Sequence, residues 1–370
     1  MTYHDTAYGS LYNGNCISVL KDLAESSIDC CITSPPYWGL RDYGTAQWRG
    51  GDPLCDHIQF LNKHGGERAD RNQEGYKKQY KSICRKCGAT KFDLQIGLEE
   101  NLDDYLLNLR IVFAEVFRVL KKDGTLWLNL GDSYAGSSMT GGFMGFGYKQ
   151  MRKHEHSTLR SGLRDKDLIG IPWMVAFTLK ELGFYLRQDI IWHKPNPMPE
   201  SVKDRCTKAH EYIFLMTKRP NYYFDQTAMF EKAAYDGRTD TLSKGSAKYS
   251  ETEKYSPSNK QTFAGTVHDR WSNVNEFGVR MRNRRSVWTV PTNGYAGAHF
   301  ATFPIDLINP MVMTTRKSAV ILDPFFGSGT TGIAAIRNGR KYLGIELSRE
   351  YCDLAASRID NELNQLTIDL

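Results

Sequence analysis

The chain has 370 residues, enough for one large α/β domain with insertions or for two domains. Hydrophobic residues make up 41% and charged residues 24% of it, which is ordinary for a globular protein, and no apolar run approaches the roughly 20 residues that a membrane-spanning helix needs. The net charge of +6 is compatible with a polyanionic partner but does not require one. Residues 1–10 are polar and lack the apolar core of a signal peptide, so we expect a cytoplasmic protein.

Strands and helices are predicted to alternate along the chain. The apolar run 28–33 predicts a buried strand that Pro35 and Pro36 end, because proline cannot donate to a strand ladder. Apolar residues at helical spacing predict a helix over 102–120, which Asp123 and Gly124 end. Further strands and helices are expected at 125–130, 172–182, 186–192, 211–217, 319–322, 330–338 and 342–345. This alternation is typical of a parallel sheet covered by helices.

Three polar stretches interrupt the alternation. Residues 51–91 carry many charges and little apolar material, and residues 225–285 are rich in Ser, Lys, Tyr and Asn. Residues 132–164 are rich in Gly, Ser and Met and predict a long loop, which inside a compact domain is usually functional or disordered.

The strongest local signal is AVILDPFFGSGTTG at 319–332, followed by a strand that ends near Glu346. Gly327 and Gly329 let the main chain approach a ligand closely, and an acid about 20 residues on can accept the hydroxyls of a ribose. A tight turn without any ligand would explain the glycines alone. Asp323 stands where a pyrophosphate would be repelled, so the pattern favours a positively charged ligand, S-adenosylmethionine, over NAD or a nucleotide.

A second signal, TSPPY at 33–37, follows the first predicted strand. Ligands of open α/β sheets bind beyond the carboxyl ends of the strands, so we expect this turn and the glycine loop to share one crevice. A turn that merely ends a strand is the bland interpretation, but it leaves the other motifs of the chain unexplained.

With these motifs the chain resembles site-specific DNA methyltransferases that modify exocyclic amines, and the resemblance covers nearly its whole length. The motif order, catalytic loop first and cofactor loop last, is similar to the β arrangement of that family, a permuted version of the usual methyltransferase sheet. The motifs are TSPPYWGLRDYGTAQW (33–48), GTLWLNLGDSYAGS (124–137), KDLIGIPWMVAF (166–177), LRQDIIWHKPNPMPESVKDR (186–205), HEYIFLMTKRPNYYFD (210–225), RRSVWTV (284–290), HFATFP (299–304) and DPFFGSGTT (323–331).

The resemblance implies a permuted Rossmann-like α/β sheet with helices on both faces and a pocket for S-adenosylmethionine. Glu346 would then bind the ribose, Asn15 would lie near the adenine, and Phe303 with Pro304 would lie against the methionine end. The residues expected to line the rest of the pocket are Asp323, Pro324, Phe325, Gly327, Gly329 and Thr330.

The expected catalytic residues are those of the Ser-Pro-Pro-Tyr turn. An aromatic amine is a poor nucleophile, and fixed acceptors for its two hydrogens, the Ser34 hydroxyl and the Pro35 carbonyl, favour a pyramidal nitrogen. Pro36 adds rigidity, and Tyr37 would stack on a base swung out of the duplex. Transfer is then a direct in-line displacement. The sequence has no Pro-Cys pair, which carbon-5 methylation through a cysteine would use.

Serine at position 34 favours cytosine N4 over adenine N6 as the target, since family members with SPPY mostly modify cytosine and those with DPPY mostly adenine. Adenine N6 stays the alternative. A zinc-containing DNA-binding protein with an inactive methyltransferase fold is a second one, although the intact motifs argue against it. RNA or protein as substrate is a third, and glutamine-methylating relatives carry NPPY instead.

A zinc site is expected in the polar stretch 51–91. Cys84 and Cys87 form a C-x-x-C-G turn that can direct two thiolates at one tetrahedral metal, and Cys55 with His57 can supply the other ligands. His64 could replace His57, and unrelated free thiols are the alternative. Four protein ligands leave no open position, so the expected role is structural.

Double-stranded DNA is the expected partner, and a cognate restriction endonuclease is a possible second one. The candidate phosphate contacts are Arg280, Arg282, Arg284 and Arg285. They lie where the family keeps its target-recognition region, although a charge run alone is more often a solvated face. Residues 136–147 could close over the duplex. The expected division is a catalytic domain from 1–50, 92–225 and 286–370, a zinc-binding insertion at 51–91 and a target-recognition region at 226–285.

Overall fold

The structure is a computed structural model that describes residues 2–39, 42–61, 76–80, 82–135, 164, 166–233, 281–292 and 303–368. Its helices there are α1 (Cys16–Asp22), α2 (Leu102–Val119), α3 (Ile171–Glu181), α4 (Ile305–Met313), α5 (Thr330–Arg337) and α6 (Arg349–Ile368), with a 3₁₀ turn, η3, at Gln226–Met229. The strands are β1 (His4–Thr6), β2 (Gly9–Asn13), β3 (Ile28–Thr33), β4 (Gln47–Arg49), β5 (Ile58–Leu61), β6 (Tyr76–Gln79), β7 (Thr90–Phe92), β8 (Leu120–Leu130), β9 (Tyr185–His193), β10 (His210–Thr217), β11 (Phe230–Lys232), β12 (Met281–Asn283), β13 (Val287–Thr289), β14 (Val320–Asp323) and β15 (Lys341–Glu346).

Within the described ranges, nine strands form one mixed sheet in the order β1-β2-β15-β14-β3-β8-β10-β9-β13. Strands β2, β15, β14, β3 and β8 run parallel to one another, as the alternation predicts. The sheet is not parallel throughout, however, because β10 pairs antiparallel with both β8 and β9. The chain turns straight back from β9 into β10 without a crossover helix, and neighbouring strands joined in that way are antiparallel.

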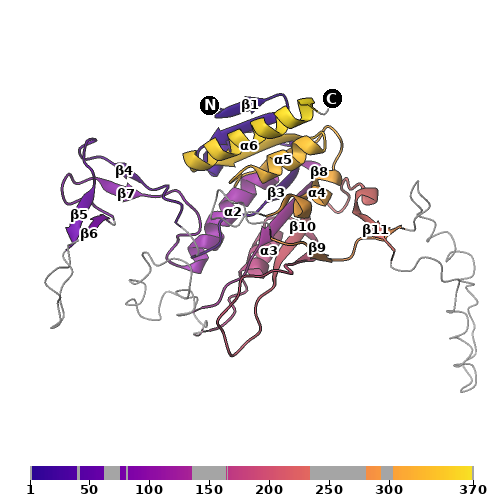
Figure 1. The fold of residues 1–370 in the computed structure, drawn as a ribbon, viewed down its shortest axis with the longest axis horizontal. Helices are drawn as coiled ribbons and strands as arrows, with labels where there is room; N and C mark the ends of the chain where they lie inside the picture. The colour runs from indigo at the N-terminus through magenta and orange to yellow at the C-terminus, as the bar shows by residue number, and fades with distance from the viewer. Residues whose placement is uncertain are drawn as a thin grey trace, which may run out of the picture.

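Helices cover both faces of the sheet (Figure 1). Alternate residues of a strand point to opposite faces, and in β3 Cys31 packs with the residues of α1, α2 and α3 while Ile32 packs with those of α4, α5 and α6. Strand β8 repeats the division with Leu128 on the first face and Trp127 on the second. The α/β class is therefore as expected, with one apolar core on each side of the sheet.

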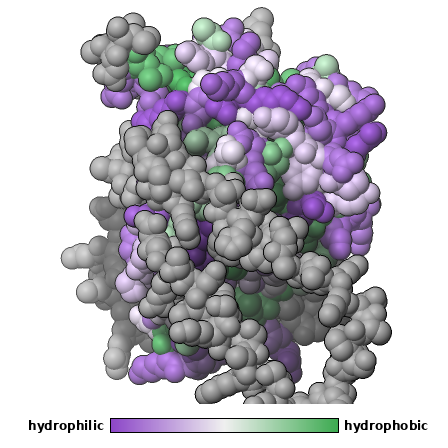
Figure 2. Space-filling model, turned by 90° about the vertical axis from the view of Figure 1, so that its right-hand side faces the viewer, coloured by the Kyte–Doolittle hydropathy of each residue, from purple (hydrophilic) through white to green (hydrophobic). Residues whose placement is uncertain are grey.

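The insertion between β3 and α2 carries two small two-stranded sheets, β4 with β7 and β5 with β6. They lie to one side of the main body, whereas β11, which pairs with β12, lies on the opposite side (Figure 1). Coloured residues on the face toward β11 are largely hydrophilic, with hydrophobic ones in small groups (Figure 2). Among the described residues, no helix is long and apolar enough to cross a membrane.

The long elements match the sequence expectations closely. Strand β3 begins and ends where predicted, and α2 differs by one residue at its end. Residues Asp123 and Gly124 do not end that helix but lie inside β8, which begins at Leu120. The sequence analysis missed the short elements β1, β2, α1, β4, β5, β6, β7, β11, β12, β13 and α4. Most of the expected loop 132–164, including the part 136–147, lies outside the described residues.

Candidate active site

The Ser-Pro-Pro-Tyr turn and the aspartate–glycine loop lie side by side at one edge of the sheet. Strands β3 and β14 are parallel neighbours, and each motif begins where its strand ends. The Thr33 hydroxyl donates a hydrogen bond of 2.7 Å to Oδ1 of Asp323, across 290 positions of sequence. The two segments therefore lie at the same edge of the sheet, and a crevice that they share stays a prediction.

Asp323, one of the expected cofactor residues, is enclosed by its neighbours. Only 1% of its surface is exposed, and it also accepts hydrogen bonds from the Thr331 hydroxyl at 2.7 Å and from the backbone N–H of Phe325 at 3.1 Å. Burial raises the pKa of this carboxyl to about 6, against the lowering effect of its three donors. In this structure Asp323 ties the cofactor loop to the catalytic strand.

The glycine loop is held in shape from both sides. Gly327 (φ +51°) and Gly329 (φ +82°) both adopt the left-handed region that favours glycine, and a Cβ on Gly329 would come within 3.0 Å of Ala355. The N–H of Gly327 donates to Oε2 of Glu346 at 2.8 Å, and the N–H of Ser348 donates to Oε1 at 2.8 Å. Burial raises the pKa of Glu346. A carboxylate thus stands beside the loop where a ribose acceptor was expected.

Arg358 is a supporting residue that the sequence analysis did not single out. From α6 its Nη1 donates to the Ser328 hydroxyl at 2.7 Å and to the Ser328 carbonyl. Nothing in a helix rich in polar residues marks one arginine as a loop anchor.

Three more expected cofactor residues occupy defined structural positions. The Asn15 side chain accepts from the Ser18 N–H at 3.2 Å and caps α1, beside the end of β15. Pro304 caps α4, and Phe303 packs on the core beneath it. Helix α4 runs back toward the start of β14, so its first turn lies at the edge that carries the active-site turns.

Hydrogen bonds to neighbouring segments hold the Ser-Pro-Pro-Tyr turn and the tryptophan that follows it. The Tyr105 hydroxyl of α2 donates to the Pro36 carbonyl at 3.0 Å, and the Trp38 indole N–H donates to the Glu99 carbonyl at 2.9 Å. The Pro35 carbonyl, the expected acceptor, is therefore not the one that Tyr105 occupies.

Tyr37 is anchored by residues that the sequence analysis did not assign to the site. Its hydroxyl donates to Oε2 of Glu211 at 2.7 Å, and Nδ2 of Asn129 donates to the same oxygen at 3.1 Å. Lys194 donates to Oε1 of Glu211. Burial, with the charge of Glu211, raises the pKa of Tyr37 well above its ordinary value, so the phenol stays protonated. The available signal was Asn129, a polar residue in the apolar run TLWLNL.

Residues 28–357 match the family model described as DNA methylase, of the N6/N4 type. The chain belongs to the DNA methylase family. This methylase is 37% identical to the type II methyltransferase M.Cfr9I of Citrobacter freundii over 95% of its own length and 88% of that protein's. It is 36% identical to M.SmaI of Serratia marcescens over 94% and 89% of the two chains.

A solved structure supports the fold of the methylase. The PvuII DNA methyltransferase, described as cytosine-N4-specific, superposes with a TM-score of 0.54 and covers 98% of this chain and 94% of its own. At 17% identity the likeness concerns the fold alone.

The insertion of the methylase brings together the four expected metal ligands. The ligand atoms of Cys55, His57, Cys84 and Cys87 all lie within 4.8 Å of one another. The Cys55 and Cys84 sulfurs are 3.7 Å apart, and the Cys87 sulfur lies 3.6 Å from Nδ1 of His57. The His57 ring stacks on Trp48 with centroids 4.3 Å apart, which fixes its orientation. His64 lies outside the described residues.

The arginine cluster is engaged within the methylase itself. Arg282 and Arg285 both donate to Oε1 of Glu231, at 2.9 and 3.1 Å, and Arg284 lies 4.2 Å over the Trp288 ring. Arg285 keeps 71% of its side chain exposed, more than Arg282 with 26%. Arg280 lies outside the described residues. A DNA-binding role for the cluster stays a prediction, and Arg285 is best placed for it.

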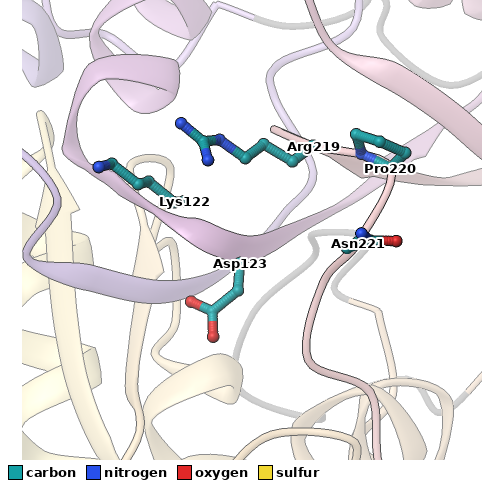
Figure 3. A pocket seen from close by; sticks show the side chains of 5 residues that line it. All are labelled: Lys122, Asp123, Arg219, Pro220 and Asn221. Carbon is teal, nitrogen blue, oxygen red and sulfur yellow. The ribbon is translucent and has the colours of Figure 1, made fainter.

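A hollow of about 410 Å³ lies at the opposite edge of the sheet from the active-site turns. Lys122 and Asp123 at the start of β8 and Arg219, Pro220 and Asn221 after β10 line it (Figure 3). Because Thr217 at the end of β10 pairs with Thr125, the hollow is remote from the ends of β3 and β14 and is not part of the active site.

Proposed function

We propose that this methylase transfers a methyl group from S-adenosylmethionine to the exocyclic amine of a DNA base swung out of the duplex. The observation that carries the proposal is the hydrogen bond between Thr33 and Asp323, which joins the catalytic turn to the glycine loop. Groups that react by direct displacement must be held within a few ångströms of one another, and neighbouring strands that end at one edge provide this.

The residues of the cofactor loop suit a nucleoside-containing ligand. Gly327 and Gly329 let the main chain approach a ligand without a Cβ in the way, and Glu346 at the next strand end is an acceptor for ribose hydroxyls. S-adenosylmethionine supplies an electrophilic methyl group attached to a sulfonium. Asp323 acts at one remove, by holding the loop and by adding negative charge beneath a cationic ligand.

The catalytic turn suits an amine acceptor. The Ser34 hydroxyl and the Pro35 carbonyl would accept hydrogen bonds from the two amine N–H groups and direct the nitrogen lone pair toward the methyl group. Tyr37 stacks on the displaced base. No side-chain nucleophile is needed, because the amine attacks directly.

Cytosine N4 is the target that we favour, on the basis of Ser34 in the SPPY turn. Adenine N6 is the alternative. The test is incubation of the protein and plasmid DNA with isotope-labelled S-adenosylmethionine, followed by mass spectrometry of the released nucleosides. Label on cytosine N4 supports the proposal and label on adenine N6 selects the alternative. Cofactor binding without labelled DNA would instead indicate another substrate or a DNA-binding role.

We further propose that the insertion holds a structural zinc ion. With Zn–S bonds of about 2.3 Å and Zn–N bonds of about 2.0 Å, a tetrahedral site separates two sulfurs by roughly 3.8 Å and a sulfur from a nitrogen by roughly 3.5 Å. The separations of 3.7 Å between the Cys55 and Cys84 sulfurs and 3.6 Å between the Cys87 sulfur and Nδ1 of His57 agree with that geometry. The fit supports a site with four protein ligands, a cross-link in place of a hydrophobic core.

A further inference from the structure

The Tyr37 hydroxyl is hydrogen-bonded to a carboxylate of the main sheet. Its hydroxyl lies 2.7 Å from Oε2 of Glu211, which sits near the start of β10. Its ring edge lies against Gly131, where a Cβ would come within 2.7 Å of Cε2 of Tyr37. The ring is thus held at its tip by an acceptor and along its side by the backbone after β8.

The carboxylate of Glu211 is itself fixed. Asn129 of β8 donates to Oε2 at 3.1 Å and also to the Tyr212 carbonyl at 3.2 Å, while Lys194, just after β9, donates to Oε1. The side chains of Glu211 and Lys194 are only 15% and 18% exposed. Residues on or next to three neighbouring strands therefore position the Glu211 carboxylate. Hydrogen bonds between groups with so little exposed surface are stronger than hydrogen bonds at the protein surface.

On the basis of this network and of the proposed function, we propose that Glu211 is a positioning residue for base capture, holding the Tyr37 ring in the orientation that receives the displaced base. A side chain already immobilised loses less conformational freedom when it stacks, so the base meets a prepared surface. Glu211 acts through the Tyr37 hydroxyl and needs no contact with the base or the cofactor.

The proposal separates Glu211 from a residue that only stabilises the fold. If its effect runs through the hydroxyl, removing that oxygen in Tyr37→Phe makes Glu211 dispensable for catalysis. A general structural role would instead add its own loss in either background.

The test is a double-mutant cycle of Tyr37→Phe and Glu211→Gln, read as single-turnover transfer of tritiated methyl groups to plasmid DNA at saturating DNA and cofactor. We expect each single variant to lose about tenfold in rate, a loss typical of one misplaced side chain in a preorganised site, and the double variant to lose no more. Cofactor affinity stays at the wild-type value, whereas the melting temperature of Glu211→Gln falls because Lys194 loses its counter-charge. Asp189→Asn, an exposed carboxyl on the neighbouring strand β9, is the matched control and keeps the wild-type rate.

Losses that multiply in the double variant, or a Glu211→Gln protein with the wild-type rate, would overturn the proposal. If Glu211→Gln does not fold, Tyr37→Phe decides alone, because it removes a single oxygen; a full wild-type rate there refutes the role of the hydroxyl. A wild-type protein that methylates no plasmid refutes the proposed function, whereas an active wild-type protein with multiplying losses refutes only the role of Glu211.

Discussion

At the scale of single residues, the two motifs of the active site divide their work between contact and support. Tyr37 is the ring of the Ser-Pro-Pro-Tyr turn and is held by Glu211, while Asp323 is enclosed and holds the glycine loop. A buried carboxylate with three donors persists only where its bonds offset the cost of burial. Substitutions at the two positions should therefore fail in different ways.

Replacing Tyr37 by alanine tests the contact role. We expect turnover to fall roughly ten- to hundredfold, because stacking on one base contributes about 1–3 kcal/mol. Cofactor binding changes little, since the glycine loop and Glu346 are untouched. Steady-state methylation and calorimetric titration with S-adenosylmethionine measure the two quantities. A Tyr37→Ala protein with the wild-type rate would show that the site has been assigned wrongly.

Replacing Asp323 tests the support role through pH. The pKa of the Asp323 carboxyl is about 6 in the folded chain and 3.8 when unperturbed, so the folded state binds this proton more tightly than the unfolded state does. The folded state therefore loses stability as the pH rises from about 4 to 6. The loss is at most about 3 kcal/mol. Asp323→Asn cannot ionise, so we expect the free energy of unfolding of the wild type, relative to this variant, to fall across that window in urea titrations. A difference independent of pH contradicts the assignment. At neutral pH the variant should also bind the cationic cofactor more weakly.

At the scale of elements, the parallel strands β3 and β14 bring the two motifs together, and the insertion between β3 and α2 is stabilised in another way. Its strands are three or four residues long, and Cys84 is the one cluster ligand with no exposed surface. Such short two-stranded sheets are marginal in water without a cross-link. A metal ion fits that need.

We expect the purified protein to contain one zinc ion per chain, measured by elemental mass spectrometry, and Cys84→Ser to lose it. Because the insertion emerges from the catalytic turn, loss of the metal should expose its backbone to hydrogen exchange while the central sheet stays protected. Cys206→Ser, at an exposed cysteine outside the cluster, keeps the metal. A fully folded, metal-free wild type would refute the zinc site.

At the scale of the whole molecule, the net charge of +6 can attract a DNA duplex only through basic side chains that are exposed. Arg285 stands out in the described part of the cluster because 71% of its side chain is exposed while one of its nitrogens is bonded to Glu231. That bond orients the guanidinium without covering it. Among the described arginines of the cluster, Arg285 is therefore the residue for which we predict a contact with DNA.

Arg285→Gln should weaken binding to plasmid DNA at every sequence alike. If the side chain contacts one phosphate, the slope of log affinity against log salt concentration falls in magnitude by about 1. Fluorescence anisotropy between low and moderate salt measures the slope. Arg337→Gln, at an arginine of α5 paired with Glu362, is the control and leaves the slope unchanged. Equal slopes for wild type and Arg285→Gln would remove this residue from the interface.

The sequence by itself determined the long elements, the α/β class and the two motif-bearing turns, because hydrophobic period and proline or glycine punctuation are local signals. It also pointed to the four cysteine and histidine side chains that the structure brings within 4.8 Å, since two closely spaced pairs of candidate ligands are a local signal. Only the tertiary structure decided the direction of β10, the burial of Asp323, and the contacts of Arg358 and Glu211. Those depend on pairings between segments up to 290 residues apart, and one chain's local pattern carries no record of which side chains meet across such a distance.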